Sequence, residues 1–175
     1  MNHQEFCDRV CRLSEQIFAD CGRVELLAAL LGTRHPETRQ LLDEPQLFVI
    51  APDEPAESIE KKDLFAVAVR SAARALGATT VALVMEAWMV QPEAINEPLN
   101  RAKIDALLDM APSEHPDRVE IVTVTVETKN GTTAYTAPIE RDADGKGRLL
   151  PFTCLGKQGR MEGRLSRFLP EHYAN

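Results

Sequence analysis

Residues 119–141, VEIVTVTVETKNGTTAYTAPIER, decide the fold that this chain is expected to adopt. Two runs rich in Val, Ile and Thr flank the dipeptide Asn130-Gly131, and such runs are typical of β-strands. Asn and Gly both tolerate positive φ, so the dipeptide indicates a type I′ turn between the two strands. The stretch therefore predicts a β-hairpin.

This turn also fixes which residues of the predicted hairpin face one another. One face is expected to be apolar, whereas the other carries mainly threonine and charged side chains and would face water or a polar partner. If the outer strand of the hairpin stayed unpaired, it would offer a route to self-association as a homo-oligomer. The expected pairs are Val126 with Tyr135, Val124 with Ala137, Val122 with Ile139 and Glu120 with Arg141.

Three further strands are predicted around the hairpin. Residues 79–90 are apolar at nearly every position, which is typical of a strand covered on both faces in the middle of a sheet. Glu86 interrupts this run. Its carboxylate must be paired, protonated or placed at the end of the sheet, because an unpaired buried charge is costly. Residues 46–50 and 149–155 are the other two β-rich runs.

Helical periodicity and end signals predict three helices. Asn2 and Glu5 match a capping box, an apolar stripe follows at helical spacing, and Gly22 offers a stop. The run from Val24 to Leu31 is rich in strong helix formers. The expected helices are residues 3–21, 24–31 and 59–76, with a short helical turn at 38–42.

Together these elements predict a single α+β domain, which suits a chain of 175 residues. We expect a mainly antiparallel sheet of about four or five strands, with the helices packed chiefly on one face. Residues 1–45 would form a helical N-terminal part, residues 46–155 the core that contains the sheet, and residues 156–175 a basic tail.

Composition narrows the class of protein. The chain has 20 Lys and Arg against 27 Asp and Glu, a net charge of −7, which disfavours a nucleic-acid-binding protein. No apolar run approaches the roughly 20 residues that a membrane-spanning helix needs, and the first residues do not resemble a signal peptide. The four cysteines lack a secretory context and are expected to be reduced. These features predict a cytoplasmic protein.

His3, Cys7 and Cys11 would share one face of the first predicted helix, because successive members are four residues apart. Imidazole and thiolate are ligands that zinc prefers, but a fourth ligand would have to come from elsewhere in the fold. The alternative is that both cysteines belong to the apolar stripe of the helix, since cysteine is often buried. The second interpretation is favoured.

The candidate functional residues gather between the predicted central strand and the hairpin. Residues 99–110 have helical spacing, and residues 113–120 are the densest cluster of reactive side chains. Together with Glu86, His115 and Asp117 could bind a divalent metal and activate water, as a metal-dependent hydrolase would require. The alternative is a structural turn whose side chains bond to the backbone.

Two other patterns point to metal chemistry. Asp117, Glu127 and Lys129 match the outline of a metal-dependent nuclease core, although polar residues that alternate beside a turn need no catalytic explanation. Residues 142–145 resemble the start of a calcium loop. The twelfth position of that loop is Thr153 where a bidentate Glu is needed, so a simple turn is expected.

The motif Glu86-Ala87-Trp88-Met89 and the segment PSEHPDRVE at residues 112–120 resemble a group of small bacterial proteins without an assigned function. The resemblance covers residues 64–150 and implies a strand, a connecting segment and a following β-hairpin, but no activity. Arg118 would bridge Glu86 or Glu120 as an ion pair that holds the connection on the sheet. The residues that it marks as one set are Glu86, Trp88, Ser113, His115, Asp117, Arg118 and Glu120.

The sequence thus favours a non-catalytic protein that acts by binding or by self-association, with no cofactor. The alternative is the metal-dependent hydrolase, which would need Glu86, His115 and Asp117 to converge on an open cleft with a divalent metal. Neither interpretation identifies a partner or a substrate.

Overall fold

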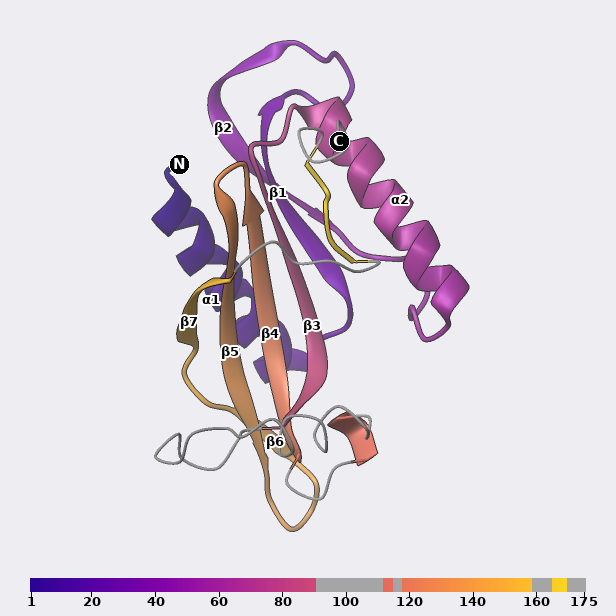
Figure 1. The fold of residues 1–175 in the computed structure, drawn as a ribbon, viewed down its shortest axis with the longest axis vertical. Helices are drawn as coiled ribbons and strands as arrows, with labels where there is room; N and C mark the ends of the chain where they lie inside the picture. Colours follow the sequence, from indigo (N-terminus) through magenta and orange to yellow (C-terminus); the bar gives the residue numbers. More distant parts are fainter. Residues whose placement is uncertain (91–111, 115–117, 159–164, 170–175) are drawn as a thin grey trace, which may run out of the picture.

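The computed structural model describes residues 1–90, 112–114, 118–158 and 165–169 of the chain (Figure 1). Their main feature is one antiparallel sheet in the order β2-β1-β3-β4-β5-β6, with β7 also paired to β5. The α+β class and the antiparallel sheet are confirmed, but the described strands number seven rather than four or five. They are β1 (Leu27–Arg34), β2 (Leu41–Ile50), β3 (Thr80–Val90), β4 (Arg118–Thr128), β5 (Gly131–Arg141), β6 (Gly147–Leu149) and β7 (Thr153–Gln158).

The helices α1 (His3–Cys21) and α2 (Ile59–Leu76) have the predicted bounds. Asn2 and Glu5 form the expected capping box at the start of α1, with both hydrogen bonds at 2.9 Å. Ser58 caps the start of α2 through its hydroxyl. Gly77, with a φ of 58°, ends α2 in the left-handed region that glycine favours.

The prediction of a helix at residues 24–31 is wrong, because Leu27–Arg34 is strand β1. This strand pairs with β2 on one side and β3 on the other, and its first six residues are buried. Burial on both faces outweighs the helix propensity of Leu and Ala. The N-terminal part of the chain is therefore one helix followed by two strands.

Strand β2 begins at Leu41, where a helical turn was expected, and continues through Pro45. Proline cannot donate a ladder hydrogen bond and is tolerated in edge strands. Within the described residues β2 is paired only to β1, so it is such an edge strand. The short turn lies earlier, where the Arg39 N–H donates to the His35 carbonyl at 3.0 Å.

The predicted hairpin forms, but its register differs by two residues from the expected one. Thr128 pairs with Gly131, so the turn residues are Lys129 and Asn130. Positive φ falls on Gly131 alone, at 122°, whereas a type I′ turn needs it at both central residues. Because the shift is even, each side chain keeps its expected face. The observed pairs include Val126 with Thr133, Val124 with Tyr135 and Val122 with Ala137.

The two helices pack on opposite faces of the sheet, so the expectation that they share one face is wrong. Side chains along β1 alternate: Ala29 and Leu31 join the core that contains residues of α1, and Ala28 and Leu30 join the core that contains residues of α2. We call these the α1 face and the α2 face. In Figure 1, α1 passes behind β4 and β5. The central position predicted for residues 79–90 is confirmed in β3, and burial on both faces holds for its first five residues but not for its second half.

The outer strand of the hairpin is not a free edge. Strand β7 pairs with β5 at residues 132–136, and β6 pairs with it at residues 139–141. The expected route to self-association through an unpaired β5 is therefore closed. Neither helix in the described part of the chain has a stretch apolar enough to cross a lipid bilayer.

Candidate functional site

Five charged or aromatic side chains occupy the α1 face at the end of the sheet where β3 stops and β4 starts. Alternation along the strands places all five on this face, beyond the apolar core. We call them the sheet-end cluster. They are Glu86 and Trp88 of β3, Arg118 and Glu120 of β4, and Arg141 of β5.

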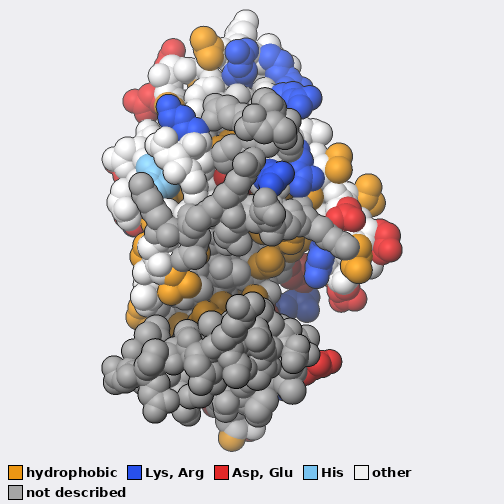
Figure 2. Space-filling view, viewed as in Figure 1, with side chains coloured by type: hydrophobic (Ala, Val, Ile, Leu, Met, Phe, Trp, Pro, Cys, Tyr) orange, Lys and Arg blue, Asp and Glu red, His pale blue; other side chains and the backbone are white. Residues whose placement is uncertain are grey.

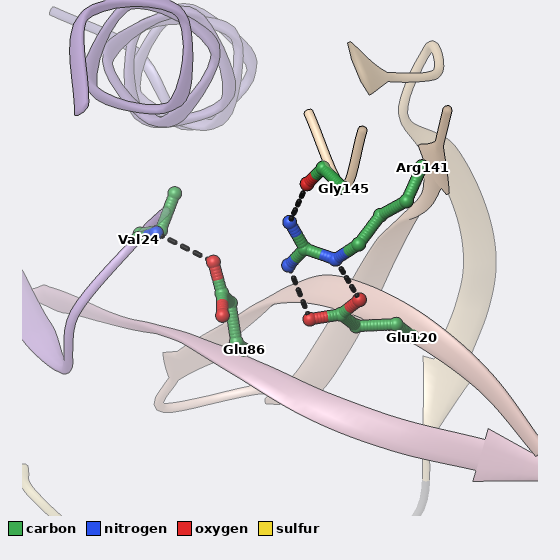
Figure 3. A network of polar contacts seen from close by, with 5 residues as sticks. All are labelled: Val24, Glu86, Glu120, Arg141 and Gly145. Atoms are coloured by element: carbon green, nitrogen blue, oxygen red, sulfur yellow. Dashed lines mark hydrogen bonds and ion pairs between the residues drawn. The ribbon is translucent and has the colours of Figure 1, made fainter. Parts of the chain in front are cut away.

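Glu86 is satisfied by the backbone. One carboxylate oxygen accepts a hydrogen bond of 2.7 Å from the Val24 N–H, in the connection between α1 and β1 (Figure 3). Burial raises the pKa of this carboxyl above its usual value, and the neighbouring Glu120 acts in the same direction. The Val24 N–H and the cations of Arg141 and Arg23 oppose that rise. Of the three alternatives expected for this residue, the structure shows a paired carboxylate.

Glu120 and Arg141 form a two-pronged ion pair in the same cluster. The two donor–acceptor distances are 2.7 Å from Nε and 2.6 Å from the terminal nitrogen (Figure 3). Arg141 also donates to the Gly145 carbonyl at 3.4 Å. The observed register puts Arg141 two positions beyond the residue opposite Glu120, so the predicted pair forms across a diagonal.

Arg118 does not bridge the carboxylates as predicted. Its guanidinium lies 5.0 Å from the centre of the Trp88 ring, which is a cation–π contact. Trp88 is 42% exposed, so this pair presents an aromatic surface to solvent. Ser113 lies in the short 3₁₀ turn η1 (Pro112–Glu114), which packs against β3 and β4.

His115 and Asp117 lie outside the described residues, as does the predicted helix at residues 99–110. Of the three residues assigned to a hydrolase, the structure describes Glu86. Among all described residues, no three His, Cys, Asp or Glu side chains are grouped closely enough to hold a metal ion.

A groove adjoins the sheet-end cluster and shares Arg141 with it. Its volume is about 820 Å³, and it lies between the second half of α1 and the β5–β6 connection. Apolar side chains of α1 and β6 line its floor, including Phe18 and Leu149. Charges of both signs also line it: Glu15, Glu140 and Asp142 are acidic, and Arg141, Lys146 and Arg148 are basic. The groove is large enough for a drug-sized molecule or a short peptide segment.

No protein-family model, curated protein or solved structure matches this chain. The resemblance to small bacterial proteins therefore remains a hypothesis.

Residues of the two sequence patterns that resembled a calcium loop and a nuclease core have structural roles. Asp142 accepts hydrogen bonds from the N–H groups of Asp144 and Lys146, at 3.0 and 2.9 Å, which is a simple turn. Glu127 is 6% exposed and lies on the α2 face, away from the sheet-end cluster.

Glu127 has a role that the sequence did not indicate. Its two carboxylate oxygens accept hydrogen bonds of 3.0 Å from the backbone N–H groups of Phe168 and Leu169. Both of those side chains are buried in the core of the α2 face. Arg70 of α2 donates to the Ser166 carbonyl at 2.9 Å. The one available signal was Glu127 itself, a carboxylate in an apolar strand that needs a partner.

The cysteines of α1 form a thiol cluster with an aromatic neighbour. Cys7 is fully buried, its Sγ lies 3.7 Å from the His3 Nε2, and Tyr135 packs against the same core. Burial raises the pKa of Cys11 to about 12 and also raises that of Cys7. Cys7 is buried and Cys11 partly buried in the apolar stripe of α1, which agrees with the favoured interpretation.

Basic side chains gather near the C-terminal end of α2. Figure 2 shows Lys and Arg at this end of the α2 face. Two of the arginines are engaged by the protein's own backbone: Arg34 donates to the Arg39 carbonyl at 3.3 Å, and Arg70 donates to the segment at residues 166–167. Both guanidinium groups therefore hold backbone segments of the protein in place.

Proposed function

We propose that this protein is a non-catalytic binding protein of the cytoplasm, and that the groove between α1 and the β5–β6 connection takes an extended peptide segment of a partner protein. The observation that carries the proposal is the groove itself, which combines apolar side chains with charged groups of both signs. Free thiols at all four cysteines support a reducing compartment.

The shape and edges of the groove favour a peptide. Strand β6 has β5 on one side and, within the described residues, no strand on the other. A free strand edge can pair with the backbone of an extended segment, while an apolar floor accepts its alternate side chains. The exposed pair of Trp88 and Arg118 extends the same surface, and Trp and Arg are the residue types that most often anchor interfaces.

The state of the carboxylates favours binding over metal-assisted hydrolysis. A metal ligand needs free lone pairs and an open coordination position. Glu86 is bonded to a backbone N–H, and Glu120 is held in two hydrogen bonds by Arg141. Both carboxylates therefore act in holding the strands and the α1–β1 connection together.

The test uses a random peptide library displayed on phage and selected against the whole protein. Ala19 is an exposed α1 residue that lines the groove, so Ala19→Trp fills the groove without disturbing the core. Ala68→Trp is the matched control, because Ala68 is an exposed alanine of α2 on the other face.

We expect selected peptides to bind the wild type and the Ala68→Trp variant equally, and Ala19→Trp about tenfold or more weakly, a loss of about 1.4 kcal/mol. Calorimetric titration of each peptide measures the difference. Selection of no peptide, or of peptides that bind Ala19→Trp as well as the wild type, would contradict the proposal.

A further inference from the structure

A second pocket lies at the opposite end of the sheet, where the β4–β5 turn and the start of α1 are found (Figure 1). Its volume is about 480 Å³. Thr80, Thr128 and Thr133 stand on the α1 face of three neighbouring strands and line it from one side. His3, in the first turn of α1, lines it from the other side.

Thr80 is a largely buried residue that lines this pocket. The residue is 5% exposed, and within the described part of the chain its hydroxyl makes no hydrogen bond. Thr128 uses its own hydroxyl in the β4–β5 turn, where it donates to Gly131 and accepts from Asn130. The Thr80 hydroxyl is therefore available to bond to a group bound in the pocket.

The charge of the pocket is opposite to that of the protein. The residues described as lining it include Lys129 and His3 but no Asp or Glu, in a chain of net charge −7. Within the described residues the Lys129 ammonium has no ion-pair partner. Helix α1 begins beside the pocket, so the positive end of its dipole adds to the favourable field for an anion. The neighbouring Glu5 is occupied by the Asn2 N–H.

From these observations we infer that this pocket binds the phosphoryl group of a small molecule. The Lys129 ammonium supplies the charge, and the hydroxyls of Thr80 and Thr133 supply hydrogen bonds to the phosphoryl oxygens. Hydroxyl and ammonium donors without competing carboxylates are the donor set that phosphate needs. The pocket exceeds the size of free phosphate, so a phosphorylated metabolite fits it better.

The test is calorimetric titration of the whole protein in low-salt, phosphate-free buffer. The probes are inorganic phosphate, ribose 5-phosphate, and ribose as the control without a phosphoryl group. Lys129→Gln removes the charge, and Thr80→Val removes the hydroxyl at nearly constant volume. The matched controls are Lys62→Gln at an exposed position of α2 and Thr123→Val on the α2 face of the sheet. Thermal unfolding of each variant checks that it is folded.

We expect binding of both phosphoryl compounds and none of ribose. Lys129→Gln should weaken binding about tenfold or more and Thr80→Val several-fold, whereas both controls bind like the wild type. Tighter binding of ribose 5-phosphate identifies a phosphorylated metabolite, and equal binding identifies free phosphate. Absence of binding to the wild type, or unchanged binding by Lys129→Gln and Thr80→Val, would overturn the inference. Neither result bears on the peptide groove, which lies at the other end of the sheet.

Discussion

The carboxylate of Glu86, on the central strand β3, accepts a hydrogen bond of 2.7 Å from the backbone N–H of Val24. Val24 is buried and lies between the end of α1 and the start of β1. The bond therefore ties the connection between a helix and a strand to the central strand β3. It also removes from Glu86 one of the lone pairs that a metal would need.

Replacement of Glu86 should change how stability depends on pH. Burial raises the pKa of Glu86 in the folded protein, so the folded state holds this proton more tightly than the unfolded chain. The free energy of unfolding then falls as pH rises from the usual carboxyl range through the folded-state pKa, and stays lower above it. Glu86→Gln keeps an acceptor oxygen for Val24 but cannot ionise, so this fall should disappear.

Urea unfolding at pH about 4 and about 7 measures the effect. The advantage of Glu86→Gln over the wild type should be larger at the higher pH, while Glu86→Ala should cost about 1 kcal/mol because Val24 loses its acceptor. Glu25→Gln, at a half-exposed carboxylate paired with Arg23, is the control. An advantage that is equal at both pH values, or larger at the lower one, would contradict the interpretation.

The parts of the fold that local signals define were predictable, and the parts that tertiary packing defines were not. The capping box at Asn2 and Glu5 and the glycine at residue 77 set the helix ends. By contrast, residues 24–31 have the composition of a helix, and only burial between β2 and β3 makes most of them a strand. The continuous apolar run at residues 26–31 fits either state, so its pattern alone could not decide.

The anchor of the C-terminal segment should be a large contributor to stability. Phe168→Ala empties a buried position and should lower the free energy of unfolding by about 3 kcal/mol or more. Glu127→Ala leaves the N–H groups of Phe168 and Leu169 without their acceptor and should cost about 1–3 kcal/mol. Urea unfolding measures both values. Leu155→Ala, at a side chain 48% exposed, is the control and should change little.

The double variant Glu127→Ala with Phe168→Ala separates the two contributions. Because both residues hold the same segment, the cost of the pair should be smaller than the sum of the single costs. Strict additivity would show that Glu127 and Phe168 act on different parts of the structure.

The ion pair of Glu120 and Arg141 should be worth more than the other ion pair of the β5–β6 region. It has two hydrogen bonds, and the side chains are 19% and 37% exposed. Arg148 and Glu140 are 74% and 56% exposed with one contact. Double-mutant cycles should give about 1 kcal/mol for the first pair and near zero for the second. Equal coupling of the two pairs, or no decrease for Glu120 and Arg141 in high salt, would be the contrary result.

The sequence could indicate that the candidate site exists but not how its members pair. Glu120 and Arg141 were expected as neighbours, and the even shift of register left them on one face. The partner of Glu86 could not be predicted from the sequence. Val24 is brought to β3 by the pairing of β1 with β3, and the composition of β1 had indicated a helix. The pocket that we infer to bind a phosphoryl group combines residues of α1, β3 and the β4–β5 turn. No single stretch of sequence contains these residues.

The four thiols should divide into two reactive and two protected groups. Cys21 and Cys154 are exposed, whereas Cys7 is buried and Cys11 is partly buried. The pKa of Cys11 is raised to about 12 and that of Cys7 is also raised, so neither forms the reactive thiolate at neutral pH. An aromatic disulfide reagent should therefore label two thiols quickly in the folded protein and all four in denaturant. The double variant Cys21→Ser with Cys154→Ser should lose the fast phase of labelling. Mass spectrometry locates the labelled thiols. Fast labelling of Cys7 or Cys11 would show that the apolar stripe of α1 does not stay packed against the sheet.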